Sequence, residues 1–328
     1  MSKFVQWENE IDYGSNINIV EQTQEKTVFQ MQDDTGEGTM VQYHILPGIM
    51  MIFNNFFMES CNSELNAGIS ILNINYCRKG RIEWEASDGR VMYIQDGDLQ
   101  IETKQNGSGR FHFPSCYYHG ITVGVQVDGM PAETLKLLKK FGIDSQELAR
   151  RFQSDSGAVA YKPSQQVERI FRDLYITDRD EPVHYFSIKI FELLLAMQIM
   201  DPKKREKKMY FQRCHVEAVK EIARLITGNP DRHYTIHQLS ELYQIPSTTL
   251  KLCFKGVFGL PIGQYLREYR MDIAAKMLQH GGESVAEIAG RVGYDNQSKF
   301  AAAFKAHKGV SPKAYGKVPV YTLEENMR

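Results

Sequence analysis

Cysteine is scarce in this sequence, and its placement excludes a cross-linked scaffold. The five cysteines among 328 residues are odd in number, lie far apart and never form a Cys-x-x-Cys pair. Disulfide frameworks and zinc sites use paired, closely spaced cysteines, so we interpret these residues as reduced thiols with a structural role. They are Cys61, Cys77, Cys116, Cys214 and Cys253.

Long hydrophobic runs are also missing. The richest apolar stretch, residues 186–200, is interrupted by Lys189 and Glu192, which is typical of an amphipathic or buried helix and not of a bilayer span. The first ten residues, MSKFVQWENE, carry acidic groups and no apolar core, so they do not resemble a signal peptide. We therefore expect a cytoplasmic protein without a membrane partner.

The residue clusters that carry catalysis are absent as well. His44, His112 and His119 never form a His-x-His pair with a following glutamate at metal-ligand spacing. No nucleophile triad, phosphate-binding glycine loop or pair of carboxylates stands at a motif spacing. We expect no metal, no cofactor and no enzymatic activity.

Charge is distributed unevenly along the chain, although the formal net charge is only −1. Residues 1–200 hold 18 Lys and Arg against 27 Asp and Glu, whereas residues 215–317 hold 14 against 9. The basic run between these parts suggests a linker at 201–214. An acidic front and a basic back are expected when only the second part meets phosphate, although an uneven solvated surface would give the same counts.

An internal repeat is the strongest signal in the chain. Residues 235–245 match residues 284–294 at a constant offset of 49. Each copy begins with a hydroxyl residue suited to capping a helix, Thr235 or Ser284, and then places apolar residues four apart on one helical face. The pattern predicts a short capped helix in each copy.

A second helix follows in each copy after a turn. Residues 250–259 match residues 300–309 at an offset of 50, with apolar residues at i, i+3 and i+4. Gly259 and Gly309 end these helices, and a proline follows soon after each. Two short helices joined by a tight turn form a helix-turn-helix unit, so the sequence predicts an all-α domain with two such units.

A helix predicted over residues 262–279 separates the two units. Its roughly 18 residues span about 27 Å at a rise of about 1.5 Å per residue. This length approaches the ~34 Å between successive major grooves on one face of B-DNA. Such a spacer suits two DNA-reading elements on one side of a duplex.

The outward face of each second helix carries groups that can contact DNA. Amide, hydroxyl and short apolar groups read base edges, while lysines contact phosphate or guanine. Any one of these residues is by itself an ordinary surface position, but the same kinds recur at one place in both copies. The candidate DNA-binding residues are Ser247, Thr248, Thr249, Lys251, Lys255, Asn296, Gln297, Ser298, Lys299 and Lys305.

Three runs in this part of the chain carry a family resemblance: LREYRM from 266, VAEIAGRVGY from 285, and GVSP from 309. Together with Phe300 and the Phe304-Lys305 pair, they make residues 215–317 closely resemble the AraC/XylS family of bacterial transcription regulators. The resemblance implies that each second helix enters a major groove, with double-stranded DNA and RNA polymerase as partners. The base-facing residues that it implies are Thr248, Thr249, Lys251, Gln297, Ser298 and Lys299.

Four residues depart from the family pattern. Gln244 stands where the family usually has a turn glycine, and Leu252, Ala301 and Ala302 occupy positions that are often polar or basic. We therefore expect the second reading helix to make few hydrogen bonds to bases and to depend on methyl contacts and DNA shape.

The first part of the chain is expected to be β-rich. From about residue 39 to 128, β-branched and aromatic runs alternate with turn signals, which predicts a small β-barrel or double-sheet jelly roll. Residues 1–130 look similar to the cupin-like sensor domain common in this family. Strands are expected at 41–45, 48–53, 69–76, 81–85, 88–94, 98–101 and 120–127.

The interior of such a barrel can bind a small effector through a few polar groups in an aromatic wall. Each candidate is individually a common packing or surface residue, so packing remains the alternative. The candidate effector-binding residues are Tyr43, Tyr76, Arg78, Glu83, Trp84 and His112.

Helical spacing follows over residues 131–200. The last helix of this region is apolar enough to suggest a second buried face. It either packs only on its own barrel or, as the resemblance implies, forms a homodimer interface; the two-helix units then occupy the final domain, 215–328. Helices are expected at 132–141, 145–152, 164–175 and 183–200.

The predicted function is a sequence-specific, DNA-binding transcription regulator modulated by a small-molecule effector. One alternative is an effector-independent DNA-binding protein controlled by abundance or by a protein partner, which ligand screening by thermal shift would distinguish. A second is a cupin enzyme with a DNA-binding module, which a stoichiometric iron or manganese content would favour.

Overall fold

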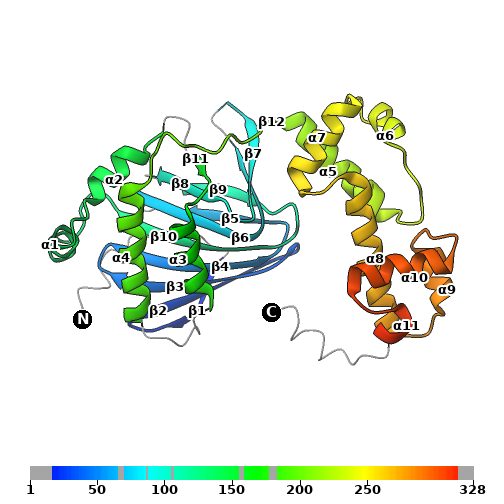
Figure 1. Ribbon diagram of the computed structural model, residues 1–328, viewed down its shortest axis with the longest axis horizontal. Helices are drawn as coiled ribbons and strands as arrows, with labels where there is room; N and C mark the ends of the chain where they lie inside the picture. The colour runs from blue at the N-terminus through cyan, green and yellow to red at the C-terminus, as the bar shows by residue number, and fades with distance from the viewer. Residues whose placement is uncertain are drawn as a thin grey trace. The chain divides into compact units, whose positions relative to one another are not determined.

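The chain forms two compact units, one ending at Tyr210 and the other beginning at Phe211. The structure is a computed structural model that describes residues 17–65, 70–85, 88–104, 107–154, 159–176 and 183–316. The first unit is a β-sheet with helices on one face, and the second is helical apart from a two-residue strand at its start (Figure 1).

The first unit is built on one curled antiparallel sheet (Figure 1). Neighbouring strands follow the order β1-β2-β3-β4-β10-β6-β7, while β8 joins β6 to β11 and β9 joins β6 to β5. The strands are β1 (Ile17–Gln22), β2 (Lys26–Asp33), β3 (Gly36–Leu46), β4 (Ile49–Phe57), β5 (Ser60–Leu65), β6 (Ile71–Glu85), β7 (Arg90–Gln95), β8 (Leu99–Lys104), β9 (Gly107–His112), β10 (Tyr118–Gln126) and β11 (Val159–Tyr161). The expected β-rich sensor region is therefore a curled sheet.

Strand β6 is continuous where the sequence predicted two strands, 69–76 and 81–85. Gly80 lies between those segments with φ +99°, and a Cβ added to it would fall 2.3 Å from the carbonyl oxygen of Tyr117. Only glycine tolerates both the backbone angle and the close approach. The glycine therefore bends the strand without ending it, so that its first half pairs with β8 and β10 and its second half with β7.

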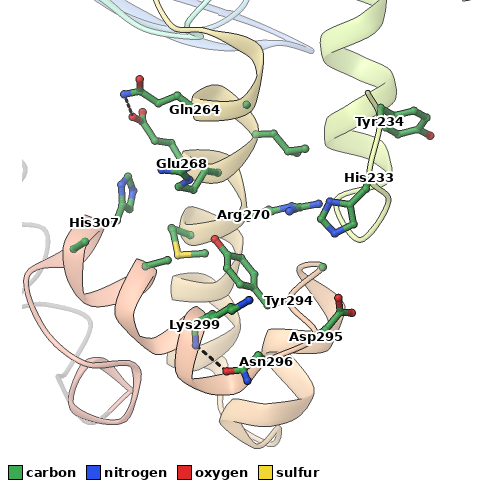
Figure 2. A pocket seen from close by; sticks show the side chains of 17 residues that line it. His233, Tyr234, Gln264, Glu268, Arg270, Tyr294, Asp295, Asn296, Lys299 and His307 are labelled. Carbon is green, nitrogen blue, oxygen red and sulfur yellow. Dashed lines mark hydrogen bonds between the residues drawn. The ribbon is translucent and has the colours of Figure 1, made fainter. Parts of the chain in front are cut away.

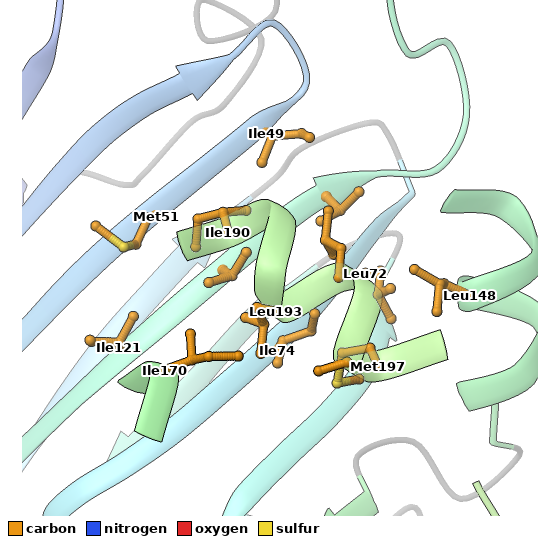
Figure 3. Close-up of a cluster of buried hydrophobic side chains, with 14 of the residues drawn as sticks. Ile49, Met51, Leu72, Ile74, Ile121, Leu148, Ile170, Ile190, Leu193 and Met197 are labelled. Carbon is orange, nitrogen blue, oxygen red and sulfur yellow. The ribbon is translucent and has the colours of Figure 1, made fainter. Parts of the chain in front are cut away.

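Alternate residues of the strands face opposite sides of the sheet. On β4, Met51 and Phe53 join the core under the helices, whereas Ile52 and Phe56 face the other side. Figure 3 shows the first core, in which Ile190 and Leu193 from one helix meet residues of several strands. Each face of the sheet thus carries its own apolar cluster. One cluster lies under the helices, and the other lines part of a cavity on the opposite face.

Four helices lie in the positions that the sequence predicted, with ends that differ by at most one residue. They are α1 (Ala132–Lys140), α2 (Ser145–Phe152), α3 (Gln165–Ile176) and α4 (Val183–Ile199). Helices α3 and α4 run across one face of the sheet (Figure 1). None of the helices described in either unit combines the length and the hydropathy needed to span a bilayer.

The basic run that follows α4 packs on the first unit as far as Tyr210. The amide of Glu206 donates to the carbonyl of Ala160 at 2.8 Å. Lys208 pairs with Asp98 at 2.5 Å, and only about a tenth of each side chain is exposed. Residues that the sequence suggested as a linker are therefore held, in part, by the edge of the sheet.

The second unit contains the strand β12 (Phe211–Gln212) and seven helices over its described range, 211–316. The helices are α5 (Arg213–Gly228), α6 (Ile236–Leu242), α7 (Ser247–Phe258), α8 (Ile262–His280), α9 (Val285–Arg291), α10 (Gln297–Lys308) and α11 (Pro312–Tyr315). The two predicted helix-turn-helix units are α6–α7 and α9–α10, with α8 between them. The predicted all-α arrangement is confirmed.

Candidate nucleic-acid interface

The first helix of each unit begins where the sequence placed a capping residue. Thr235 accepts a hydrogen bond from the amide of Gln238 at 3.2 Å, and the Gln238 side chain accepts from the amide of Thr235 at 2.9 Å. Ser284 and Glu287 form the same reciprocal pair at 3.3 and 2.7 Å. These capping boxes satisfy amides that would otherwise lack partners and fix the start of each unit.

The turns differ between the two units. Gln244 adopts φ +51° and Gly293 adopts φ +77° at equivalent positions. The turn therefore needs a left-handed residue in both copies, and the first copy meets the need without glycine. Helices α7 and α10 then both end at a left-handed glycine, Gly259 or Gly309, as predicted.

Each unit has an apolar core of its own. Leu250, Phe254 and Val257 of α7 are fully buried, and α7 packs against α5 and α6. Phe300 and Phe304 of α10 are also fully buried, in a cluster supplied by α8 and α9. Burial of these stripes fixes which side of α7 and α10 faces outward.

Helix α8 connects the two helix-turn-helix units and holds them together through Arg270. This side chain is 7% exposed and donates to the carbonyl oxygens of Pro230, at 2.7 Å, and Arg232, at 3.2 Å. Figure 2 shows Arg270 reaching from α8 toward the loop that carries His233. A Cβ on Gly293 would fall 2.8 Å from the Arg270 guanidinium. The loop before α6, the spacer helix and the turn of the second unit therefore meet at one residue.

Burial lowers the pKa of the Arg270 guanidinium below its ordinary value. Both carbonyl contacts compensate for the lost hydration of this charge. The role of Arg270 was not predicted, because a sequence run such as LREYRM does not indicate which loop its second arginine will contact. Arg270 is thus a structural residue that sets the spacing of the two units.

A groove of about 920 Å³ lies beside Arg270, between α8, α10 and the two connecting loops (Figure 2). Asn296 and Lys299, two of the predicted DNA-binding residues, line it together with Arg267 and His307. Asn296 caps α10 by accepting from the amides of Ser298 and Lys299 at 2.9 and 3.0 Å. Its carbonyl oxygen is therefore committed to the helix, which leaves its amide nitrogen for other partners.

The outward surfaces of α7 and α10 match position by position. Thr248, Leu252 and Lys255 are exposed on α7, at i, i+4 and i+7. On α10, the exposed residues at the equivalent positions, 50 residues later, are Ser298, Ala302 and Lys305. Residues at this spacing share one helical face. We call these two sets the outer faces; each presents a hydroxyl, an aliphatic group and a lysine in the same order.

The lysines of the predicted set are unpaired. Within the described part of the chain, no carboxylate forms an ion pair with Lys251, Lys255, Lys299 or Lys305. Nearby cations do have such partners: Lys308 lies 2.7 Å from Asp272, and Arg291 lies 2.6 Å from Glu283. The outer faces therefore keep uncompensated positive charge, which favours contact with phosphate.

The remaining predicted residues differ in exposure. Lys251 and Gln297 are exposed, whereas Ser247 and Thr249 are only partly exposed on α7. Leu252, which the sequence marked only as a departure from the family pattern, is half exposed at the centre of its outer face. Its exposure could be found in the sequence from the helical phase set by Leu250 and Phe254.

The six effector candidates are not gathered in one cavity. Tyr43 contacts Phe186 of α4, with ring centroids 4.7 Å apart, and Tyr76 stacks on Phe171 of α3 at 4.5 Å. Arg78 lies over the ring of Tyr175, 4.3 Å from its centroid. These three are on the sheet face that the helices cover.

The other three candidates lie near the second half of β6. Glu83 is buried and accepts a hydrogen bond from Tyr93 at 2.7 Å. Trp84 packs against the second apolar cluster. His112 of β9 lies directly opposite Glu83 of β6 in the sheet. The sequence predicted the residue types of a binding wall but not which strand face each one would occupy.

A cavity of about 170 Å³ lies on the other face of the sheet, and its described lining includes none of the six. A ladder of side chains forms its polar wall: Asn54 donates to Thr122 at 2.9 Å, Thr122 donates to Asn75 at 3.2 Å, and Tyr118 donates to Asn75 at 2.9 Å. The Asn75 amide donates to Gln100 at 3.3 Å. The rest of the lining is largely apolar, with methionines and phenylalanines, and includes Asn73 and Glu102. This ladder could not be predicted from the sequence, since its members come from four strands.

The cysteines are all unpaired, and three of the five are buried. Burial raises the pKa of the Cys61 and Cys253 thiols to about 12. Both therefore stay protonated at neutral pH, which makes them poor nucleophiles and metal ligands. Among the residues described, no three His, Cys, Asp or Glu side chains gather as a metal site.

Comparison with known proteins identifies the helical unit that begins at Phe211. A family model described as a helix-turn-helix domain matches residues 239–317. The HTH-type transcriptional activator AarP of Providencia stuartii is 33% identical over 97 residues, which are 30% of this chain and 72% of that protein. An AraC-like relative from Streptomyces lividans is 34% identical over 91 residues, or 28% of this chain and 30% of that protein.

The match to several relatives thus spans less than a third of their length. Among solved structures, the C-terminal domain of AraT, a response regulator from Geobacillus stearothermophilus, is 30% identical, with a TM-score of 0.30. It covers 32% of this chain and 89% of its own. From the family model and from AarP, the chain belongs to the AraC-type family of helix-turn-helix transcription regulators.

Proposed function

We propose that this protein regulates transcription in the cytoplasm by binding double-stranded DNA with the outer faces of α7 and α10. The observation that carries the proposal is the match between those faces: both expose a hydroxyl, an aliphatic group and an unpaired lysine at equivalent positions. Helix α8 has 19 residues, or about 28 Å at about 1.5 Å per residue. That length suits two helices entering successive major grooves.

The test is binding-site selection with the full-length protein from a library of random duplexes, followed by fluorescence anisotropy on the enriched site. We expect Lys251→Ala and Gln297→Ala each to weaken binding without lowering the melting temperature. Lys276→Ala is the matched control, because this lysine is exposed on α8 outside both outer faces. Failure to enrich any sequence, or equal affinity in all three variants, would contradict the proposal.

The sensor role of the first unit rests on the cavity beside the amide ladder. We propose that the curled sheet acts as a cupin-like, jelly-roll sensor. The cavity wall offers hydrogen bonds from Asn54, Asn75 and Gln100, and its described lining holds the carboxylate of Glu102 but no lysine or arginine. Such a lining suits a small, largely apolar effector that has one or two polar groups and no negative charge.

A thermal-shift screen of the full chain against neutral metabolites tests this role. We expect a hit to stabilise the protein by RT ln(1 + [L]/Kd), and we expect Asn75→Leu to abolish the shift. Thr39→Val is the control, since Thr39 lies on a different small cavity. Stabilisation that persists unchanged in Asn75→Leu would place the effector elsewhere.

We further propose that two chains associate through α4 and that the dimer acts on RNA polymerase at the promoter. Ile188 and Ile199 are 67% and 81% exposed, and Leu195 lies between them on the same side of the helix. An exposed aliphatic stripe of this kind favours a partner. Sedimentation should show a dimer that Ile188→Glu converts to a monomer, and a monomeric starting protein would contradict this interface.

A further inference from the structure

We infer that Leu252 and Ala302 determine specificity by contacting the 5-methyl group of thymine, one in each half of the binding site. The inference rests on the proposed function, since it requires both outer faces to enter major grooves. It concerns the chemistry that the centre of each face can recognise.

Leu252 and Ala302 hold equivalent places in the two units. Both lie four residues after a hydroxyl, Thr248 or Ser298, and three residues before a lysine. Each is on the side of its helix opposite the buried stripe, at the middle of the outer face. A group at that position points at base edges when the helix lies in a major groove.

The exposure of Leu252 contrasts with the burial of its neighbours on α7. Its side chain is 50% exposed, whereas its neighbours Leu250, Cys253 and Phe254 are fully buried. Burial of Leu252 in a complex would therefore remove apolar surface from water, which is favourable. The exposed half of the Leu252 side chain is available for a partner.

The partner that fits both positions is a thymine methyl group. In the major groove, every base edge presents hydrogen-bonding groups, and thymine alone adds an apolar group. Leu252 and Ala302 cannot donate or accept hydrogen bonds, so they would desolvate the amino group of cytosine or the oxygen of guanine without replacing the lost bond. Thymine is the base that leaves the least unsatisfied.

The surroundings favour DNA over a protein partner. Lys251 and Lys255 lie within one turn of Leu252 and have no acidic partner in the described chain. An apolar protein surface would have to bury these charges or solvate them at its rim. A DNA groove instead places phosphates on both sides of a central apolar contact.

The two residues differ in reach. Leucine extends two carbons further from the backbone than alanine, so it can reach a methyl group without close approach of α7. Ala302 needs α10 to lie deeper, and the small Ala301 and Ala306 leave space for this on the same helix. We therefore expect Leu252 to give the larger discrimination of the two.

The experiment replaces thymines with deoxyuridine in the site selected by the full-length protein. Deoxyuridine lacks only the 5-methyl group, so hydrogen bonding and charge are unchanged. We expect one substitution in the half-site of Leu252 to weaken binding about fourfold, the factor that burial of one methyl-sized group gives. One substitution in the half-site of Ala302 should weaken it by a smaller factor that still exceeds about twofold. Deoxyuridine at the remaining positions should change affinity less than twofold, within about 0.4 kcal/mol.

Variants assign each loss to its residue. Leu252→Ala should remove most of the deoxyuridine effect in its own half-site and leave the other half-site sensitive. Ala302→Ser should act in the reverse way. Leu242→Ala is the matched control, because Leu242 is 63% exposed on α6 and belongs to neither outer face; it should leave both effects intact.

The outcomes separate this inference from the proposed function. Selection without any enriched sequence would overturn both. An enriched site that tolerates deoxyuridine at every position, or one whose sensitivity is the same in Leu252→Ala, would overturn the inference and leave DNA binding standing. Loss of solution binding to another protein in Leu252→Ala, with unchanged DNA affinity, would also overturn it.

Discussion

The two helix-turn-helix units share one plan but obtain rigidity and DNA contact in different ways. The second unit has a glycine turn fitted tightly around Arg270 and a core supplied by α8. The first has Gln244 in its turn and packs on α5. The outward side of α7 carries Lys251 and the longer Leu252 where α10 has Ala301 and Ala302, whereas α10 carries Lys299 where α7 has Thr249.

This difference suggests a division of labour. The two reading helices carry the same number of unpaired lysines, but α7 has the greater apolar reach at Leu252, so we expect α7 to provide more of the binding energy. The second unit, held by Arg270 at a fixed distance, positions the protein on a neighbouring groove. Three sets of substitutions and a change of pH test how the two helix-turn-helix units differ.

Gly293→Ala should be the most destabilising change, and it acts on the second helix-turn-helix unit, α9–α10. The new Cβ would lie 2.8 Å from the Arg270 guanidinium and 2.9 Å from the Pro230 carbonyl, at φ +77°. We expect a loss of about 2 to 4 kcal/mol in unfolding free energy, measured by urea denaturation. Gln244→Ala, at the equivalent turn, is the control and should change stability by less than about 1 kcal/mol. Equal losses at the two turns would remove the distinction between them.

Exchanging the lysine between outer faces should shift DNA affinity in opposite directions. Lys251→Ala removes one cation from α7, and Ala301→Lys adds one at the matching place on α10. We expect changes of about fivefold each, with the slope of log affinity against log salt falling or rising by about one. A salt slope that neither variant alters would show that these positions do not meet phosphate.

Gln244→Gly should slightly stabilise the first helix-turn-helix unit, α6–α7. A left-handed residue other than glycine carries about 1 to 2 kcal/mol of strain, while glycine costs up to about 1 kcal/mol in chain entropy. The net gain is expected to stay below about 1 kcal/mol in thermal denaturation. A clear loss of stability would indicate that the Gln244 side chain makes a contact that the turn needs.

Acidic pH should weaken the capping box at the start of α9 and leave the capping box at the start of α6 unchanged. Hydrogen bonds to Ser284 hold the pKa of Glu287 below its ordinary value. Because the folded state favours the ionised form, this stabilisation is complete above the unfolded pKa and is lost as pH falls through the folded pKa. The corresponding residue of the first cap, Gln238, does not titrate.

Amide exchange at the start of α9, compared with the start of α6, measures this difference. We expect protection in α9 to decrease below about pH 4.3, the ordinary glutamate pKa, while protection in α6 stays constant relative to the global stability. Glu287→Gln should abolish the difference. A parallel decrease in both helices would contradict the assignment to the cap.

The repeat, its caps and its spacer could be predicted because their signals are local. Thr235, Ser284, Gly259 and Gly309 each act within one helical turn, so sequence spacing alone identifies them. The outer faces followed from helical phase for the same reason. Only the function of Arg270 escaped, since its carbonyl partners lie 38 and 40 residues away.

The β-sheet unit that ends at Tyr210 was harder to predict than the helix-turn-helix units, because its arrangement depends on pairings between distant residues. Tyr43 and Tyr76 were candidates for a binding wall, but the face of a strand that meets a helix is decided by the whole sheet. The ladder around Asn75 joins residues up to 68 positions apart. The basic run after α4 suggested a free linker, because the partner of Lys208, Asp98, lies 110 residues earlier.

Both helix-turn-helix units are expected to contact one face of a duplex, about one helical turn apart. A hydroxyl-radical footprint of the full-length protein on its selected site measures this spacing. We predict two protected patches whose centres are about 10 base pairs apart on the same side of the helix, one of which weakens in Leu252→Ala. A single protected patch, unchanged by substitutions in one of the two outer faces, would contradict the account.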